Sequence, residues 1–262
     1  MSDVGVRLAV AICVLVPIVS PIAHAERLVF VQRDGVHVRP GADDAAAHTS
    51  SIVPRATTIK PWDASDEVWA ETLACLRRIY APFAVTITED DPGDTPYIAA
   101  VFGGSPLQLG LARNVRGYAP LRSDCSLIES GYVFAFTELE PDAAAACRTM
   151  AQEIGHSYGL DHELREGDVM SVQAFDGERS FGAEVVACGE SSARPCGPSG
   201  RCRASQSSYR VLADRLGVAG EGTPIAGAGC SSGGSPGPLV LVAISTWIGR
   251  ARARRRGARA PR

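Results

Sequence analysis

The residues of this 262-residue chain that could carry out chemistry gather in one short stretch with the spacing Q-E-x-x-H-x-x-G-x-x-H. Residues four apart share a face of a helix, so a helix here would project Gln152 and His156 to the same side. Gly159 can end that helix and turn the chain at a positive φ, which would return His162 to the same point in space. Two imidazoles with a carboxylate, Glu153, beside them are the components of a catalytic zinc site.

The predicted chemistry follows from the usual layout of such sites. A catalytic zinc ion takes three protein ligands and leaves one position for water, whose pKa it lowers towards about 7. Glu153 lies next to a ligand position and three residues before His156, where it can accept the proton of that water and pass it to a leaving amine. Alone, each residue would indicate only a helix acid or a structural histidine. The joint spacing carries the prediction, and Asp161 is assigned a structural role.

The surrounding pattern predicts the elements that must position these residues. A helix is expected over residues 141–159, because a Pro-Asp start is followed by strong helix formers. An earlier amphipathic helix, capped by Asp63 or Ser65, should run to about residue 80. We further expect strands over residues 83–88, 97–102 and 132–136, a hairpin over 27–39 around Asp34-Gly35, and a last helix over 206–216.

The first 25 residues are typical of a signal peptide. Arg7 precedes an apolar run over residues 8–19, and an A-x-A cleavage pattern occupies 23–25. A transmembrane anchor is the weaker alternative, because the run is short and interrupted by proline. We therefore expect an exported protein whose mature chain starts at Glu26.

Six cysteines remain in the mature domain, a number that favours three disulfides in an oxidising compartment. Cys196 could pair locally with Cys188 or Cys202, and a bond between Cys125 and Cys147 would tie the loop at 125 to the predicted motif helix. A cysteine-based zinc cluster is the rival interpretation, but the spacing is irregular and the compartment is unsuitable.

The C-terminal region is expected to consist of a Gly/Ser/Pro linker over residues 218–237 and a tail over 238–262. The tail has an apolar patch of about ten residues, short of the roughly 20 that span a bilayer, and then seven arginines. The order of Cys230, spacer, apolar patch and arginines resembles the sorting signal of myxobacterial surface proteins. That resemblance implies anchoring at Cys230 on the cell surface, with membrane contact only through the tail before processing.

The net charge of −3 conceals an asymmetry, because the tail arginines leave about −10 on the residues between the signal peptide and the tail. Such a segment has no basic footprint for nucleic acid. We therefore expect no nucleic-acid partner. We also expect a monomer, and the peptide or protein partner follows from the resemblance described next.

Glu153, His156, Gly159 and His162 match, position for position, the pattern H-E-x-x-H-x-x-G-x-x-H of the metzincin metallopeptidases, and Met170 matches the family's Met-turn. The chain resembles this family over about residues 26–217. The resemblance implies an α/β fold of α+β zincin-like type, with a twisted mixed sheet packed on two long helices. The active-site helix would close an upper part, 26–159, and an irregular, disulfide-bonded lower part would span 160–217.

The same resemblance implies a zinc-dependent endopeptidase that binds peptide along an edge strand, which we look for within residues 109–119. Its Zn²⁺ would be held by His156 and His162, supported by Gly159 and Met170. Gln152 stands where the family has its first histidine. Three outcomes are open: ligation through the amide oxygen, a two-histidine site, or a pseudoenzyme that serves as a surface peptide-binding or interaction module.

Overall fold

A computed structural model of the protein describes residues 27–220. At its centre is a five-stranded mixed sheet in the order β5-β1-β6-β8-β7, in which only β7 runs antiparallel to its neighbour. In that order the strands are Val85–Thr88, Arg27–Gln32, Tyr97–Phe102, Gly131–Ala135 and Gly117–Tyr118. The predicted strands and the antiparallel edge strand within residues 109–119 are confirmed.

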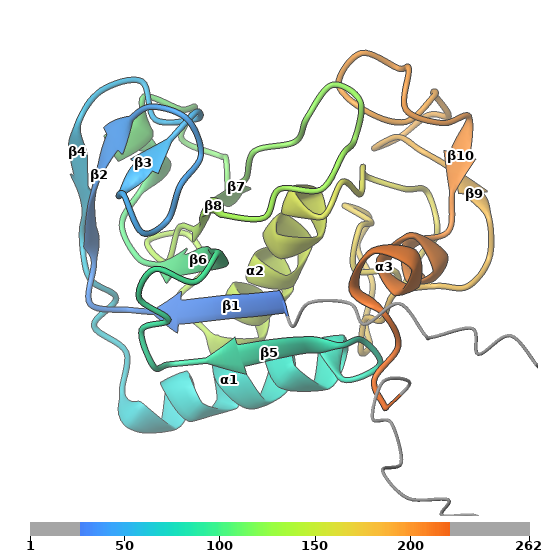
Figure 1. Cartoon of the computed structure of the whole chain (residues 1–262). Coiled ribbons are helices and arrows are strands. Elements are labelled where there is room, and N and C mark those ends of the chain that lie inside the picture. Colours follow the sequence, from blue (N-terminus) through green and yellow to red (C-terminus); the bar gives the residue numbers. More distant parts are fainter. Residues whose placement is uncertain (1–26, 221–262) are drawn as a thin grey trace, which may run out of the picture. The chain divides into compact units, whose positions relative to one another are not determined.

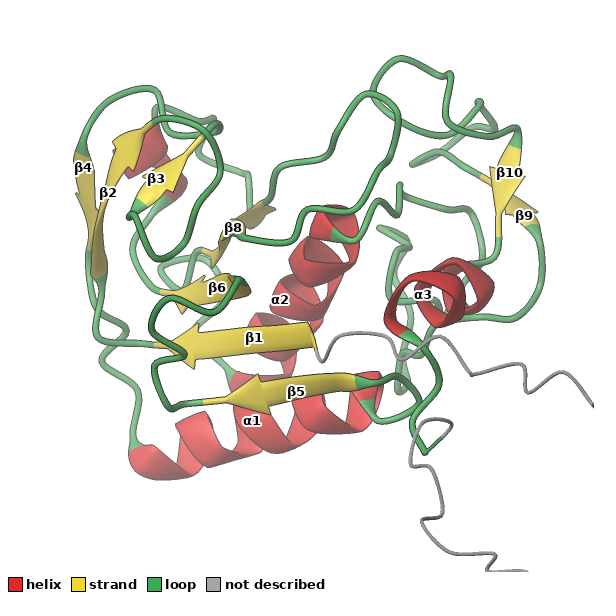
Figure 2. Cartoon of the chain, viewed as in Figure 1, coloured by secondary structure: helices red, strands yellow, loops and turns green. Residues whose placement is uncertain are grey.

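Two long helices, α1 (Asp66–Tyr80) and α2 (Ala143–Ser157), pack against this sheet and against each other (Figures 1 and 2). Ser65 caps α1 by accepting a hydrogen bond from the backbone nitrogen of Val68 at 3.4 Å. The face of α1 that carries Leu73 and Leu76 is buried in the core that it shares with α2. Burial of this face stabilises the helix pair, since a buried leucine contributes roughly 1.5–3 kcal/mol.

The central strand β6 is buried on both faces, as its continuous apolar sequence predicted. Ile98 and Phe102 belong to the core beneath the helices, whereas the alternate residues Tyr97 and Val101 belong to a second core. That second core is covered by a small sheet in the order β3-β2-β4 and by the 3-10 helix η1 (Pro106–Leu109). The strands of the small sheet are β2 (Val36–Pro40), β3 (Thr49–Ser50) and β4 (Thr57–Ile59).

The hairpin predicted over residues 27–39 is wrong. Gly35 does make a turn at φ 79°, but β1 and β2 belong to different sheets. Both edges of β1 are occupied, by β5 on one side and β6 on the other, so no edge is left for β2. β2 pairs instead with β3 and β4.

After α2 the chain is mostly irregular, as predicted, with a two-stranded pairing of β9 (Val186–Ala187) and β10 (Ser205–Gln206) and the helix α3 (Ser208–Leu216). Figure 2 shows loops making up most of this C-terminal part. Residues 218–219, which we assigned to the linker, continue the folded part, since Val218 bridges to Phe83. The signal peptide, Cys230, the remaining linker and the tail lie outside the described residues.

Three disulfides join Cys75 to Cys147, Cys125 to Cys202 and Cys188 to Cys196. The local Cys188–Cys196 pair was among the predictions, whereas the pairing of Cys125 with Cys147 is wrong. Cys147 lies on the face of α2 that packs against α1, where Cys75 is its neighbour. The disulfides indicate an oxidising, extracellular-type environment. Within residues 27–220, no helix is both long and apolar enough to cross a membrane.

Candidate metal centre

Helix α2 positions the first residues of the motif. Asp142 caps its start by accepting a hydrogen bond from the backbone nitrogen of Ala145 at 2.8 Å. The helix ends at Ser157, and Gly159 at φ 81° reverses the chain, as its sequence predicted. A Cβ at this glycine would collide with the carbonyl oxygen of Cys125, so the turn needs glycine both for its φ and for space.

The turn brings the two histidines together. Their Nε2 atoms lie 3.1 Å apart, and their ring centroids are 4.7 Å apart at 67°. Two ligands of one zinc ion, each about 2.0–2.1 Å from it in a tetrahedral array, lie roughly 3.3–3.5 Å from each other. The 3.1 Å between the Nε2 atoms of His156 and His162 is slightly shorter than this range and is also a hydrogen-bonding distance. The two rings would have to separate only slightly to become ligands of one ion.

The other ring nitrogens fix the tautomers. His156 Nδ1 is 2.8 Å from the carbonyl oxygen of Leu160, which can only accept, so this nitrogen donates. His162 Nδ1 lies 3.0 Å from Oε1 of Glu190. Hydrogen bonding to Arg194, aided by the bond to His162, lowers the pKa of Glu190 to about 2, so this carboxylate also accepts.

The Nε2 atoms of both rings therefore face each other, because each Nδ1 is taken up by its oxygen partner. Two lone pairs at 3.1 Å repel each other unless a proton or a metal ion lies between them. Burial, and next the charge of the nearby His162, lower the pKa of His156 to about 4, so this ring is neutral at neutral pH and its Nε2 presents a lone pair. Both Nδ1 atoms have the oxygen partners that metal-binding histidines use.

Glu153 is buried beside this pair, and burial raises its pKa to about 8. Among residues 27–220, its carboxyl group has no hydrogen-bond partner. It lies against Gly117 of edge strand β7, where an added Cβ would come within 2.6 Å of Glu153 Cγ. A buried carboxyl without a partner, facing a cavity, is typical of a functional acid or base.

Gln152 is the point at which the site departs from a three-histidine centre. Its amide nitrogen donates to the carbonyl oxygen of Val169 at 3.0 Å. The side chain is thus tied to the segment after the motif, and only its oxygen is left to reach another group. No hydrogen bond within the described part of the chain links Gln152 to either histidine.

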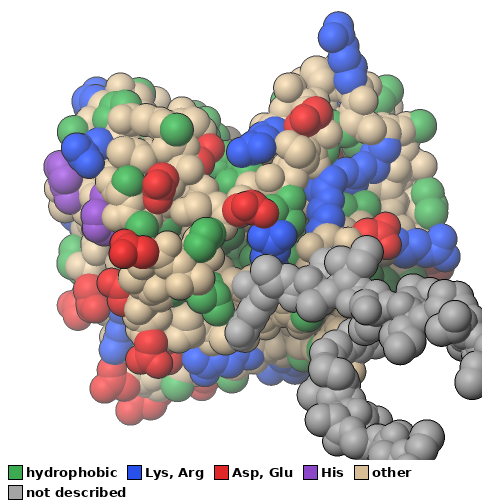
Figure 3. Space-filling model, viewed as in Figure 1, with side chains coloured by type: hydrophobic (Ala, Val, Ile, Leu, Met, Phe, Trp, Pro, Cys, Tyr) green, Lys and Arg blue, Asp and Glu red, His purple; other side chains and the backbone are tan. Residues whose placement is uncertain are grey.

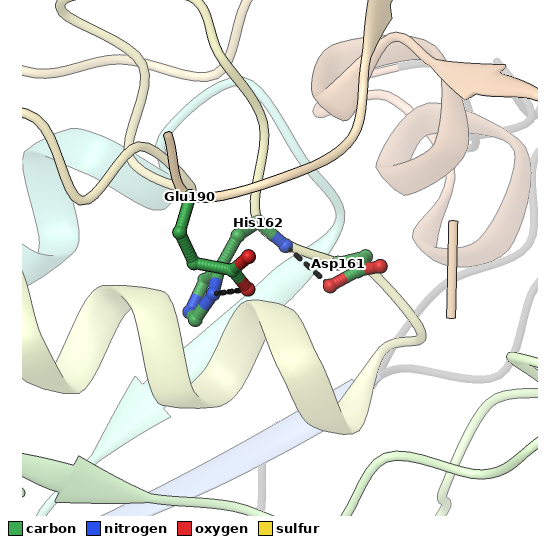
Figure 4. A group of neighbouring side chains, drawn as sticks. All are labelled: Asp161, His162 and Glu190. Carbon is green, nitrogen blue, oxygen red and sulfur yellow. Dashed lines mark hydrogen bonds and ion pairs between the residues drawn. The ribbon is translucent and has the colours of Figure 1, made fainter. Parts of the chain in front are cut away.

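The sequence did not indicate Glu190 as a site residue. It orients His162 from 28 residues away, within a loop rich in Gly, Ser and Pro that has no readable spacing. Asp161 has the structural role predicted for it: it accepts from the backbone nitrogen of His162 at 2.8 Å and is paired with Arg194. Figure 4 shows Glu190 against the imidazole of His162, and Asp161 against its backbone.

The oxygens of Asp161 and Glu190 and a ring nitrogen of His162 all lie within 4.8 Å of one another, so the three residues form a second potential metal-binding group. Arg194 already occupies this group, because its guanidinium bonds to both oxygens of Asp161 and to Glu190. Asp161 also accepts from the backbone nitrogen of Gly197 at 2.6 Å. The cluster therefore supports His162, because Arg194 and backbone N–H groups already occupy the oxygens that a metal ion would need.

Met170 lies in the turn that the sequence indicated. The backbone nitrogen of Ser171 donates to the carbonyl oxygen of Asp168 at 3.2 Å, which closes a four-residue turn. Asp168 stabilises it further by accepting from the backbone nitrogen of Met170 at 2.8 Å. The Met170 side chain is fully buried against Gly155 of α2, one residue before His156.

A cavity of about 670 Å³ opens next to these residues and is lined by Gln152, Glu153 and His162. Its other walls are β7, the exposed side of α2 and residues 169–179. The face drawn in Figure 3 is hollowed between the side that carries β2–β4 and the C-terminal part of the chain. The volume is typical of a ligand pocket, roughly 300–1,000 Å³.

No protein-family model matches the chain, and a search of curated proteins finds no match either.

Proposed function

We propose that the protein is an exported, surface-anchored zinc endopeptidase with a zincin-like fold of metzincin type. The observation that carries the proposal is the pair of Nε2 atoms of His156 and His162, which face each other at 3.1 Å. Both partner nitrogens already donate to oxygen, so the pair is arranged for a cation. A zinc ion held there would act as a Lewis acid and lower the pKa of a water molecule.

In this proposal Glu153 is the general base. Its carboxylate takes a proton from the attacking water and later returns it to the amine nitrogen of the departing peptide. Burial raises the pKa of Glu153 to about 8 in the metal-free protein, and a cation held by the two histidines would lower it towards neutral pH, where a general base is most effective. The carboxyl is free to do this because no described residue holds it.

Edge strand β7 (Gly117–Tyr118) is the proposed binding edge for the peptide. It pairs with β8 on one side only, and it lies at the end of the sheet. An extended peptide can add to such an edge by main-chain hydrogen bonds. Contact between Gly117 and Glu153 would bring a peptide at this edge close to the general base.

One observation favours the second candidate, a non-catalytic module that binds peptides at the surface. The hydrogen bond to Val169 occupies the amide nitrogen of Gln152, so only the amide oxygen could bind zinc. A neutral amide oxygen is a weaker zinc ligand than imidazole. A site with two histidines would hold zinc less firmly. The fold and the peptide-binding edge would then remain without hydrolysis.

Metal content separates the candidates first. The purified mature protein, dialysed against zinc and then against buffer, is expected to retain one zinc per chain by elemental analysis. Retention of less than one equivalent would remove the catalytic proposal. The variant His162→Ala is the control for site-specific binding, and it should lose the metal.

Hydrolysis of a mixed peptide library is then measured by mass spectrometry. The wild type should cleave, and Glu153→Ala should retain the zinc and lose cleavage. Activity that survives in Glu153→Ala would exclude Glu153 as the base. If the wild type is inert and Gln152→His gains strong cleavage, the natural protein is the non-catalytic module.

A further inference from the structure

Two arginines, Arg148 and Arg179, give one wall of the cavity beside Glu153 a positive charge. Arg148 lies on α2 one helical turn before Gln152, so the two side chains share a face of the helix. Arg179 approaches from the segment that follows the Met170 turn. The two arginines thus reach the same cavity from different elements.

The carboxylates that line the cavity do not balance these arginines. Glu140 is buried and is already paired with Arg116. Glu153, the remaining carboxyl group of the lining, forms no ion pair with either Arg148 or Arg179.

Arg179 is held in place without an anion. Its guanidinium donates to the carbonyl oxygens of Asp168 at 2.8 Å and Ser171 at 2.6 Å, and also to that of Gln173. The ring of Phe175 lies 6.0 Å from its guanidinium carbon. Carbonyl oxygens fix the guanidinium without an ion pair. The Asp168 carboxylate acts on it only through space, because that carboxylate is already bonded to Arg165 and Ser208. A guanidinium fixed in this way is preorganised to bind an anion.

Arg148 is exposed and has neither a hydrogen bond nor an ion pair within residues 27–220. It lines the same cavity as Arg179, and the pKa of Arg179 is lowered by burial and next by the charge of Arg148. Like charges are held near each other here against their repulsion. A carboxylate placed between them would relieve that repulsion and accept hydrogen bonds from Arg148 and from the N–H groups of Arg179 that no carbonyl oxygen already holds.

We propose that Arg148 and Arg179 select peptides that carry an aspartate or glutamate side chain next to the bond facing Glu153 and the two histidines. The hydroxyl groups of Thr149 and Ser171 line the same cavity and can add donors to the carboxylate. The exposed Val172 and Phe175 offer apolar contact to its methylene groups. This inference rests on the proposed peptide binding at β7, but it does not require hydrolysis.

The test measures binding, so that it stands apart from catalysis. Fluorescent decapeptides carry Asp, Asn or Lys at each position in turn, and their affinities for the mature protein are measured by anisotropy with a chelator present. At one or two adjacent positions, the Asp peptide is expected to bind about tenfold more tightly than the Asn peptide, the range for a charged hydrogen-bonded contact. Equal affinity for Asp, Asn and Lys at every position would overturn the proposal.

The decisive variant is Arg148→Glu, because Arg148 has no partner to lose within the described residues. It should reverse the preference in favour of Lys, whereas Arg148→Lys should keep a reduced preference for Asp. The matched control is Arg210→Glu, an exposed arginine on α3 that does not line the cavity. A loss of preference in the control equal to that in Arg148→Glu would mean general charge attraction and would overturn the proposal.

The outcomes separate this inference from the proposed function. Acid-selective binding without cleavage of any peptide contradicts the endopeptidase and leaves the inference standing. Cleavage that is indifferent to Asp near the cut bond contradicts the inference alone. Thermal melting of each variant at the wild-type temperature shows that a changed preference is not an effect of unfolding.

Discussion

At the scale of single residues, the site opposes the stability of the protein. A buried carboxyl group without a partner is unfavourable when ionised, and Glu153 is such a group. The pKa of Glu153 rises from its ordinary value of 4.5 to about 8 in the folded chain, because burial penalises the charged form. The fold therefore favours the protonated form, and that contribution is complete below pH 4.5 and is lost as the pH rises to 8.

Replacing Glu153 with Gln should accordingly stabilise the metal-free protein only at higher pH. We expect equal free energies of unfolding near pH 4.5 and a gain of about 3–5 kcal/mol at pH 8, at about 1.4 kcal/mol for each pKa unit. Urea denaturation of the wild type and the variant at the two pH values measures this difference in the free energy of unfolding. Glu166→Gln, at an exposed position, is the control and should show little change. A gain that is the same at both pH values would contradict the assignment of a buried, unpaired carboxyl.

Glu190 has the opposite environment, since it is hydrogen-bonded to both Arg194 and His162. Its role is to hold the His162 ring, so Glu190→Gln should weaken zinc binding about 10- to 100-fold while the two histidines remain. Competition with a chromophoric chelator measures the affinity. An unchanged affinity would show that the ring orientation does not depend on Glu190. Glu166→Gln again serves as the matched control.

The site residues that lie close together in the sequence could be predicted, whereas those that join the site from distant segments could not. The spacing of Glu153, His156 and His162 spans ten residues, and a helix with a glycine turn converts such spacing directly into proximity. Glu190 joins the site through a disulfide-closed loop, whose path depends on tertiary contacts. The bond between Gln152 and Val169 is likewise a contact between two segments, and no local pattern encodes it.

At the scale of elements, the same distinction separates the helices from the sheet. Both long helices were predicted to within a few residues, because caps at Ser65 and Asp142 are local signals. Pairing of strands is not local. The turn at Gly35 looks like a hairpin in sequence, but β1 is enclosed by β5 and β6, which come much later in the chain.

The glycine turn that follows α2 leads to a prediction about stability. Gly159→Ala should lower the free energy of unfolding by about 3 kcal/mol, the sum of a positive-φ cost of about 1–2 and a packing clash with the Cys125 carbonyl. Gly110→Ala separates the two terms, since its φ of 73° is similar but no atom lies within 4 Å of an added Cβ. It should cost only about 1 kcal/mol. Equal losses in the two variants would show that the clash is absorbed.

At the scale of the whole molecule, the disulfides divide into two kinds. Six cysteines allow fifteen connectivities, and the sequence alone did not select among them. Cys75–Cys147 crosses 72 residues and joins the two long helices, whereas Cys188–Cys196 closes only 8. The short loop contains Glu190 and Arg194, which contact His162 and Asp161. Of these two disulfides, the first therefore supports the framework and the second supports the site, while the third, Cys125–Cys202, ties the loop at 125 to the C-terminal part.

Removing each disulfide should thus have different consequences. By the loop-entropy relation, Cys75→Ala with Cys147→Ala should cost about 4 kcal/mol of stability, and Cys188→Ala with Cys196→Ala about 2–3 kcal/mol. Zinc affinity should follow the reverse order, because only the second pair frees the loop that orients His162. Denaturation and chelator competition on the same two proteins measure both quantities. If the first pair weakened zinc binding as much as the second, the short loop would have no separate role at the site.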